Sequence, residues 1–170
     1  MKRKGESKVG RSRTRGHRAN EQNEGILPRV CIIGAGCSGM TAAKAMKDAG
    51  IPFDCYEKGS DIGGLWRFGN DNGMSSVYKS LHINTHRDRM EYRDYPMPHD
   101  YPDYPSHSLI YSYFQDYAKQ FGIYEHIQFK TAVQHVEPEP DGTYEVTLSD
   151  GRQIHYDSVM VANGHHWSER

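Results

Sequence analysis

Apolar and polar positions follow the periods of a strand–helix–strand unit in the first patterned part of the chain. Residues 29–33 (RVCII) hold a continuous apolar run after Arg29, which is typical of a parallel strand buried on both faces. Residues 38–49 then repeat apolar side chains at about helical spacing, and Gly50 is a residue at which such a helix ends. Residues 53–56 (FDCY) form a second short strand. The pattern therefore predicts a βαβ unit.

The pattern beyond this unit predicts a long loop, one more helix and a β-meander. Residues 58–106 are crowded with Gly, Asn, Asp, Pro and Tyr and show no long period, as expected of a functional loop. Residues 108–122 carry apolar side chains every four positions and predict a helix. Segments 127–138, 143–150 and 152–164 alternate or run apolar between turn sequences, which predicts a meander returning to a buried strand. The fold class is therefore α/β.

Positive charge is concentrated at the start of the chain. Residues 1–25 hold eight Lys or Arg against three Glu, a net charge of +5, whereas the remainder has a net charge of −6. The first residues contain almost nothing that a core could bury, so 1–28 is predicted to be a disordered basic leader and 29–170 the folded part. Because no aromatic residue interleaves with these charges, we expect no nucleic-acid partner.

Composition and cysteine usage favour a cytoplasmic protein. No run approaches the ~20 apolar residues of a membrane-spanning helix, and the leader lacks the apolar region of a signal peptide. The three cysteines are odd in number and form no C-x-x-C motif, which argues against metal and dithiol chemistry. The histidines accompany no nucleophile motif, and no metal site is expected. A homodimer is left open as the assembly.

Three glycines between the first predicted strand and helix form a G-x-G-x-x-G motif. Gly34 allows a tight turn, Gly36 lets the backbone approach a pyrophosphate, and Gly39 lets the helix pack closely on the strand. Glu57 follows at the end of the second strand, 18 residues beyond Gly39, where a carboxylate can bind ribose hydroxyls. The motif predicts a dinucleotide site, the simpler interpretation being a structural glycine turn with a surface glutamate. The acidic residue suits a free ribose, so NAD and FAD both remain open.

A series of motifs resembles one enzyme family. GAGCSG at 34–39 is followed by Glu57-Lys58, GGLW at 63–66, VYKSL at 77–81, Asn84, Met-x-Tyr-x-Asp-x-Pro at 90–96 and VMVANGHH at 159–166. From about residue 29 to 167 the chain resembles the N-terminal part of a flavin-containing monooxygenase, a flavoprotein with two dinucleotide-binding domains that oxygenates substrates with NADPH and O2. The resemblance implies a Rossmann-like FAD-binding βαβ unit with a β-meander.

The resemblance also assigns roles to individual residues. It implies that FAD is bound by Gly34, Gly36, Ser38, Gly39, Glu57, Lys58, Gly64, Leu65, Trp66, Asn84, Thr85 and Val136. Asn84 is the candidate catalytic residue, because an amide beside the flavin ring would stabilise the C4a-hydroperoxide through which family members oxygenate soft N or S nucleophiles. Taken by themselves, the residues also allow Trp66 to be an ordinary core aromatic and Asn84 to be a turn-capping side chain.

The family continues beyond Arg170 into a second, NADPH-binding domain. The resemblance therefore implies a partial FAD-binding domain at 29–170, an incomplete two-dinucleotide fold, and a fragment that is inactive alone. Two other interpretations are a non-catalytic FAD-binding fragment and a Baeyer–Villiger-type monooxygenase fragment, the latter disfavoured by VYKSLHINT at 77–85. A flavin oxidase or disulfide reductase is disfavoured because the C-x-x-C motif is missing.

Overall fold

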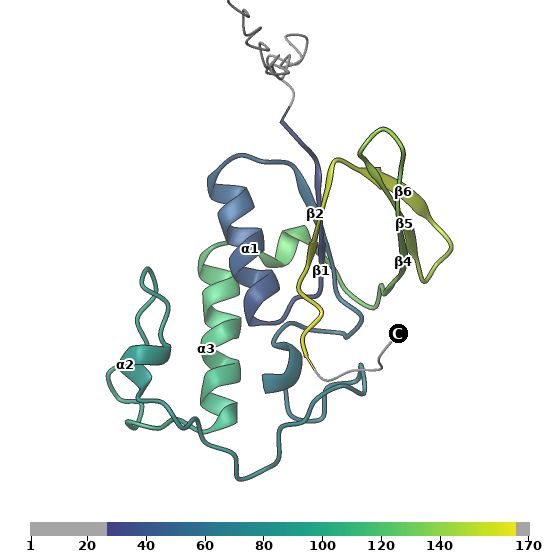
Figure 1. Cartoon of the computed structure of the whole chain (residues 1–170). Coiled ribbons are helices and arrows are strands. Elements are labelled where there is room, and N and C mark those ends of the chain that lie inside the picture. The colour runs from purple at the N-terminus through teal and green to yellow at the C-terminus, as the bar shows by residue number, and fades with distance from the viewer. Residues whose placement is uncertain (1–26, 166–170) are drawn as a thin grey trace, which may run out of the picture.

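The computed structural model describes residues 27–165, and its frame is a parallel sheet of strand order β3-β2-β1-β7 (Figure 1). The strands are β1 (Val30–Ile33), β2 (Phe53–Tyr56), β3 (Ile127–Gln128) and β7 (Ser158–Val161). All three pairings are parallel, which confirms the two strands predicted at 29–33 and 53–56. The predicted leader at 1–28 lies outside the described residues, apart from its last two positions.

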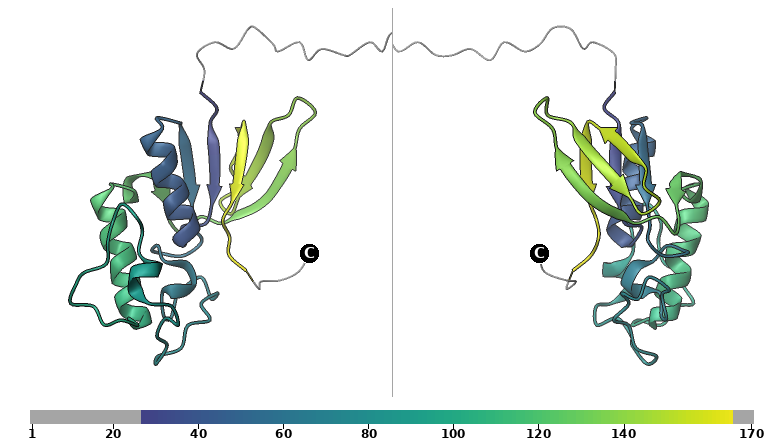
Figure 2. Two further views of the ribbon diagram at one scale, coloured as in Figure 1. Left: turned by 60° about the vertical axis from the view of Figure 1, so that its left-hand side comes forward. Right: turned by 90° about the vertical axis from the view of Figure 1, so that its right-hand side faces the viewer.

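Helices cover one face of this sheet, and an antiparallel sheet covers the other (Figure 2). The elements of these two layers are α1 (Cys37–Asp48), α3 (His107–Gln120), β4 (Val133–Pro138), β5 (Tyr144–Leu148) and β6 (Gln153–Tyr156). The strands of the second sheet have the order β4-β5-β6. The predicted helices and meander are therefore confirmed. Within residues 27–165, no helix has the length and apolar character needed to cross a bilayer.

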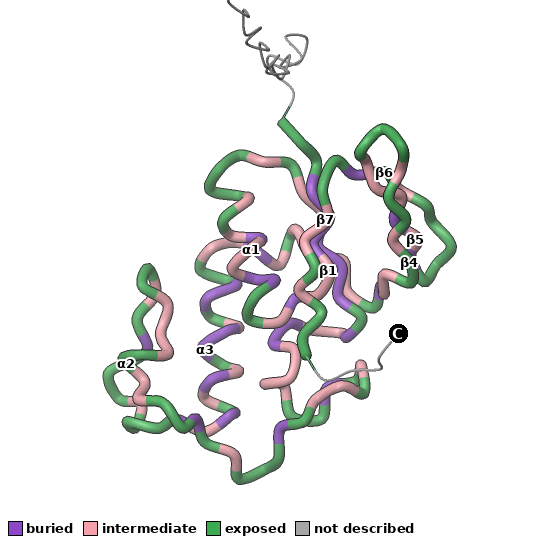
Figure 3. The backbone as a smooth tube through the Cα atoms, in the orientation of Figure 1, coloured by how far each residue is buried: buried purple, intermediate pink, exposed green. Residues whose placement is uncertain are grey.

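Two apolar clusters join the layers, and β1 contributes to both because its side chains alternate between the two faces of the sheet. Val30 and Ile32 belong to the cluster shared with α1 and α3, whereas Cys31 packs against the antiparallel sheet. The side chains that α3 buries are His107, Ile110, Tyr113, Phe114, Tyr117 and Ala118. Figure 3 shows the buried positions following β1 and α3. Burial on both faces explains why the sequence of β1 is continuously apolar.

The structure divides two segments that the sequence presents as single runs. Segment 127–138 breaks at Lys130, whose φ is 54° and whose N–H donates to the Gly59 carbonyl at 2.9 Å. Segment 152–164 breaks at Asp157, whose carboxylate accepts the Arg29 N–H at 2.7 Å. The first break separates β3 from β4, and the second separates β6 from β7. Both depend on hydrogen bonds to residues far along the chain, which a local pattern does not contain.

The long loop between β2 and α3 is anchored to both helices. Its regular pieces are a 3₁₀ turn at Gly64–Trp66 and α2 at Arg87–Met90. Its Met-x-Tyr-x-Asp-x-Pro segment places Asp94 in an ion pair with Lys44 of α1, with 2.6 Å between Oδ2 and Nζ. The Tyr92 ring packs on the rings of Tyr113 and Tyr117 of α3. This motif therefore docks the loop on the helical layer.

The positions of the cysteines predict how many thiols the folded protein exposes. Cys31 and Cys55 are buried in the parallel sheet, and burial raises the pKa of each thiol to about 12. Cys37, at the start of α1, is exposed. A thiol reagent used near neutral pH should modify Cys37 alone in the native protein and all three cysteines after denaturation, because the thiolate is the reactive form. Peptide mapping that finds native-state label on Cys31 or Cys55 would contradict this arrangement.

Candidate functional site

The glycine motif forms the predicted tight turn between β1 and α1. Gly34 has φ +97°, and a Cβ there would lie 2.7 Å from the carbonyl oxygen of Ala162, so both its conformation and its surroundings require glycine. Gly39 lies in the first turn of α1, where a Cβ would come within 1.8 Å of the Gly34 carbonyl oxygen. These two glycines let the helix approach the carboxyl ends of β1 and β7 closely.

Gly36 has a different role, because neither its conformation nor its neighbours require glycine. As the N-cap residue of α1 it has φ −72°, a value that any residue can adopt. The nearest described atom to a Cβ built there is the Gly64 Cα at 3.7 Å, an ordinary van der Waals distance. No described side chain caps α1, and its first turn has no acidic residue. The positive end of the helix is therefore available to an anion in the space beside Gly36.

Glu57 follows β2 with a buried side chain, 4% exposed. Its Oε2 accepts the Ala35 N–H at 2.8 Å, and its Oε1 accepts the Gly59 N–H at 2.7 Å. Asn72 Nδ2 lies 3.5 Å from the same Oε1. These bonds hold the carboxylate beside the glycine turn, so the interpretation of Glu57 as a surface glutamate is wrong. Each carboxylate oxygen still has acceptor capacity for a ligand hydroxyl.

A second glycine pair, Gly63–Gly64, packs against the first glycine turn and extends the wall of the site. Gly63 has φ +104° and donates its N–H to the Ala35 carbonyl at 3.1 Å. A Cβ on Gly64 would lie 3.1 Å from the Gly36 Cα, so the two glycine turns touch. Leu65 and Trp66 follow in the 3₁₀ turn and extend this wall. The site is thus built from two backbone segments that approach each other without side chains between them.

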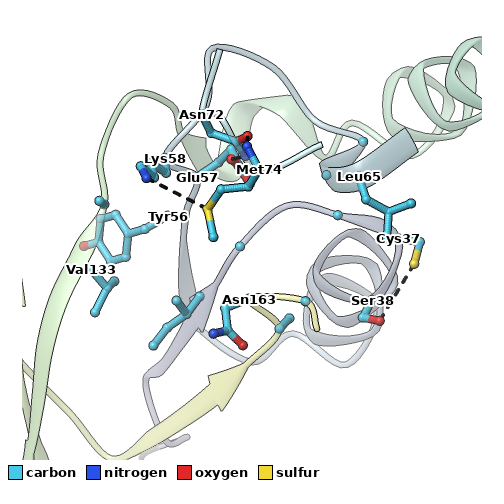
Figure 4. Close-up of a pocket in the computed structure, with 18 of the residues that line it drawn as sticks. Cys37, Ser38, Tyr56, Glu57, Lys58, Leu65, Asn72, Met74, Val133 and Asn163 are labelled. Carbon is cyan, nitrogen blue, oxygen red and sulfur yellow. Dashed lines mark hydrogen bonds between the residues drawn. The ribbon is translucent and has the colours of Figure 1, made fainter. Parts of the chain in front are cut away.

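These walls border a cleft of about 400 Å³ at the carboxyl ends of β1, β2 and β7 (Figure 4). Its lining residues are Ile33, Gly34, Gly36, Cys37, Ser38, Tyr56, Glu57, Lys58, Gly63, Gly64, Leu65, Trp66, Asn72, Met74, Thr131, Ala132, Val133, Ala162, Asn163, Gly164 and His165. Lys58 and Met74 lie 3.9 Å apart, from Nζ to Sδ. Ligand sites of open α/β sheets lie at this edge of the sheet.

The cleft brings together most of the residues that the sequence assigns to FAD. The lining includes Gly34, Gly36, Ser38, Glu57, Lys58, Gly64, Leu65 and Trp66. Gly39 lies behind the lining and supports it through its contact with Gly34. Asn84 and Thr85 are exposed and lie outside the lining, with 3.5 Å between Thr85 Oγ1 and Asn84 Oδ1. The roles of Asn84 and Thr85 therefore stay predictions.

Val136 also lies outside the lining, and Val133 is the β4 residue that borders the cleft. Residues three apart face opposite sides of a regular strand, but the register of β4 against β5 shifts between Val133 and His135. Both valines consequently pack against the cluster under the antiparallel sheet. A register shift of this kind leaves no signal in the sequence, and the contact of Val136 with FAD stays a prediction.

Several lining residues were missed by the sequence analysis, among them Tyr56, Asn72, Met74 and Asn163. Tyr56 and Asn163 have one usable signal, because each lies at the carboxyl end of a parallel strand, where ligands of such sheets bind. Asn72 and Met74 belong to the long loop and reach the cleft only because of how this loop folds. The loop sequence has no helical or strand period from which that path could be predicted.

Residues 28–170 match the family described as flavin-binding monooxygenase-like. The chain belongs to this family. It is 43% identical over 149 residues to flavin-containing monooxygenase 5 of Oryctolagus cuniculus, covering 82% of this chain and 28% of that protein. It is 42% identical over 150 residues to dimethylaniline monooxygenase (N-oxide-forming) 2 of Cavia porcellus, covering 83% of this chain and 28% of that protein. The chain therefore spans about a quarter of the length of these curated relatives.

A solved structure shares the fold of this family member. S-allyl-L-cysteine S-oxygenase from Allium sativum matches with a TM-score of 0.76 and 29% identity, over 85% of this chain and 38% of that one. Together the comparisons confirm the family expected from the motifs and its Rossmann-like FAD-binding fold. The description of the family as flavin-binding supports a flavin as its cofactor.

Alanine at Gly39 and alanine at Gly36 should differ sharply in their effect on stability. Gly39→Ala drives a Cβ into the Gly34 carbonyl and should lower the free energy of unfolding by about 1–3 kcal/mol, the usual range for overpacking. Gly36→Ala adds a methyl group at ordinary van der Waals distance from Gly64 and should change this free energy far less. Denaturant titration of the protein without added ligand measures both values, and equal losses would refute the geometry of the turn.

Proposed function

We propose that this chain is the FAD-binding part of an NADPH- and O2-dependent monooxygenase that oxygenates soft nitrogen or sulfur nucleophiles. The observation that carries the proposal is the placement of Gly36 and Glu57 at one cleft, where a helix N-terminus without a cap from any described side chain adjoins a buried carboxylate. The helix end suits a diphosphate, and the carboxylate suits ribose hydroxyls. A dinucleotide presents both groups together.

The first turn of α1 would hold the diphosphate. The N–H groups of this turn have no hydrogen-bond acceptor within the helix, and the helix dipole favours an anion at this end. Gly36 adds no side chain, so a phosphate can reach the backbone directly. Gly64 packs against Gly36 without a side chain, so the two glycine backbones form one continuous surface along which the diphosphate would lie. The geometry of the cleft therefore fits the diphosphate, which joins the two halves of FAD.

Glu57 would hold the ribose of the adenosine half. Because each carboxylate oxygen already accepts a backbone N–H, the side chain cannot rotate away from the cleft. Its negative charge accepts hydrogen bonds from free 2′- and 3′-hydroxyls and repels a 2′-phosphate. This preference favours FAD over NADP at this cleft.

Leu65 and Trp66 extend the cleft with the apolar surface that a flavin ring needs. Bound FAD would supply the oxygen-activating chemistry, while residues of this chain bind it, orient it and exclude water. Oxygenation of nitrogen or sulfur is supported by the names of two similar proteins, one N-oxide-forming and one an S-oxygenase. We also propose a cytoplasmic location, since all three cysteines are free.

Substitution of Gly36 tests the cofactor site directly. Gly36→Ala places a methyl group where the diphosphate would contact the backbone, so its Kd for FAD should rise about tenfold or more, because a lost charged hydrogen bond costs about 1.5–3 kcal/mol. Flavin fluorescence titration measures this Kd. Ser112→Ala, on the exposed side of α3, is the control and should bind FAD like the unaltered chain. Equal FAD binding by the Gly36→Ala variant, or none by the unaltered chain, would refute the site.

The role of Asn84 can be tested in a longer protein, in which this chain continues into the NADPH-binding part expected of the family. There, Asn84→Ala should increase the hydrogen peroxide released per NADPH oxidised, because the amide would no longer help retain activated oxygen beside the flavin. Coupled assays of NADPH oxidation and peroxide release measure this ratio. A ratio unchanged from that of the unaltered protein would remove Asn84 from the catalytic site.

A further inference from the structure

Asp61, two residues before the Gly63–Gly64 pair, is the meeting point of three segments of the chain. Its Oδ2 accepts the Tyr111 hydroxyl at 2.6 Å and the Gln115 Nε2 at 3.0 Å, both from α3. Its Oδ1 accepts the Tyr124 hydroxyl at 3.0 Å and the Ile62 N–H at 2.8 Å. Four donors thus converge on one half-buried carboxylate. None of these donors lies among the residues that line the cleft.

Asp61 holds its charge through hydrogen bonds with neutral donors. Burial by itself would raise the pKa of Asp61, but the bonds from Tyr111, the Ile62 amide and Tyr124 outweigh burial and keep this pKa below its ordinary value. The neighbouring cation, Arg67, pairs with Asp71 instead. Hydrogen bonds to an ionised acceptor are shorter and stronger than neutral ones, and each has a defined direction. The cluster therefore fixes both the position and the orientation of the Asp61 side chain.

The same cluster also packs on the glycine pair that borders the nucleotide cleft. A Cβ on Gly63 would lie 2.8 Å from two ring carbons of Tyr111, so the Tyr111 ring packs directly on the Gly63 backbone. On the other side, the Gly63 N–H is bonded to Ala35 of the β1–α1 turn. Gly63 is thus clamped between α3 and the wall that carries Gly36, and Gly64 is the next residue.

We infer that Asp61 is a positioning residue for the dinucleotide: by tying the Gly63–Gly64 turn to α3, it sets where this turn packs on Gly36 and so the shape of the glycine surface along which the diphosphate would lie. The inference rests on the proposed FAD site. The two facing glycines carry no side chains that could rotate to compensate for a shift of the turn. A displacement of Gly64 would therefore alter the fit of the diphosphate directly.

A purely stabilising role for Asp61 makes a different prediction. If the cluster only held α3 to the loop, its loss would lower thermal stability and weaken every ligand of the folded protein to the same degree. A positioning role confines the effect to ligands that lie along both glycine turns. FAD spans both walls, whereas adenosine 5′-monophosphate carries the ribose that Glu57 would bind but lacks the diphosphate bridge.

The test compares the Kd of FAD with the Kd of adenosine 5′-monophosphate in the whole chain. Asp61→Asn keeps the size of the side chain and removes its charge, so the Kd of FAD should rise about tenfold, while the Kd of the monophosphate stays unchanged. Tyr124→Phe removes one of the four donors and should give an intermediate rise. Tyr113→Phe is the matched control, because this α3 hydroxyl accepts the Tyr92 N–H at 2.7 Å and does not bond Asp61.

Melting temperatures without ligand, and the visible circular dichroism of bound flavin, complete the measurement. Failure of the unaltered chain to bind FAD would overturn the proposed function together with this inference. FAD binding by the unaltered chain and an equal Kd in Asp61→Asn would overturn the inference alone. So would equal weakening of both ligands, or an effect of Tyr113→Phe as large as that of Asp61→Asn. If Asp61→Asn does not fold, Tyr124→Phe is judged by the same criteria.

Discussion

The close contact between Gly39 and the Gly34 carbonyl determines where every other part of the site lies. Because a single Cβ at Gly39 would overlap that oxygen, α1 can sit on the turn only with a bare backbone at this position. The helix then begins directly above the carboxyl ends of the strands. Glu57 reaches the same point from the neighbouring strand and completes the turn by accepting the Ala35 N–H. The proposed anion binding and sugar recognition would both follow from this one approach of two backbones.

Glycine-rich walls are costly to order, since glycine loses more conformational freedom on folding than any other residue. Aromatic packing on α3 offsets part of this entropic cost. Tyr92 and Tyr95 of the loop pack against Tyr113, Tyr117 and Phe121, and each such ring pair contributes about 0.5–1.5 kcal/mol beyond burial. The tyrosine-rich segment of the long loop thus supports a site that it does not line.

The local elements and the dinucleotide turn were predictable from the sequence, because their causes are local. The apolar run of β1, the period of α1 and the spacing from Gly34 to Gly39 all act within a few residues. The two strand breaks at Lys130 and Asp157 were not predictable, since each depends on a hydrogen bond to a distant residue. The Asp61 cluster escaped for the same reason: three of its four donors lie 50 or more residues away along the chain.

The carbonyl of Ala162 lies against Gly34, and the Ala162 side chain lies 3.6 Å from a Cβ built on Gly39, so the end of β7 is part of the floor on which the nucleotide would rest. Among the described strands, β7 pairs only with β1, and it is joined to that partner across more than a hundred residues of chain. A nucleotide bound there would stabilise, by mass action, the folded state in which β7 pairs with β1. A cofactor at this position would therefore stabilise the pairing of β7 with β1, which joins the residues farthest apart in sequence among the described strand pairs.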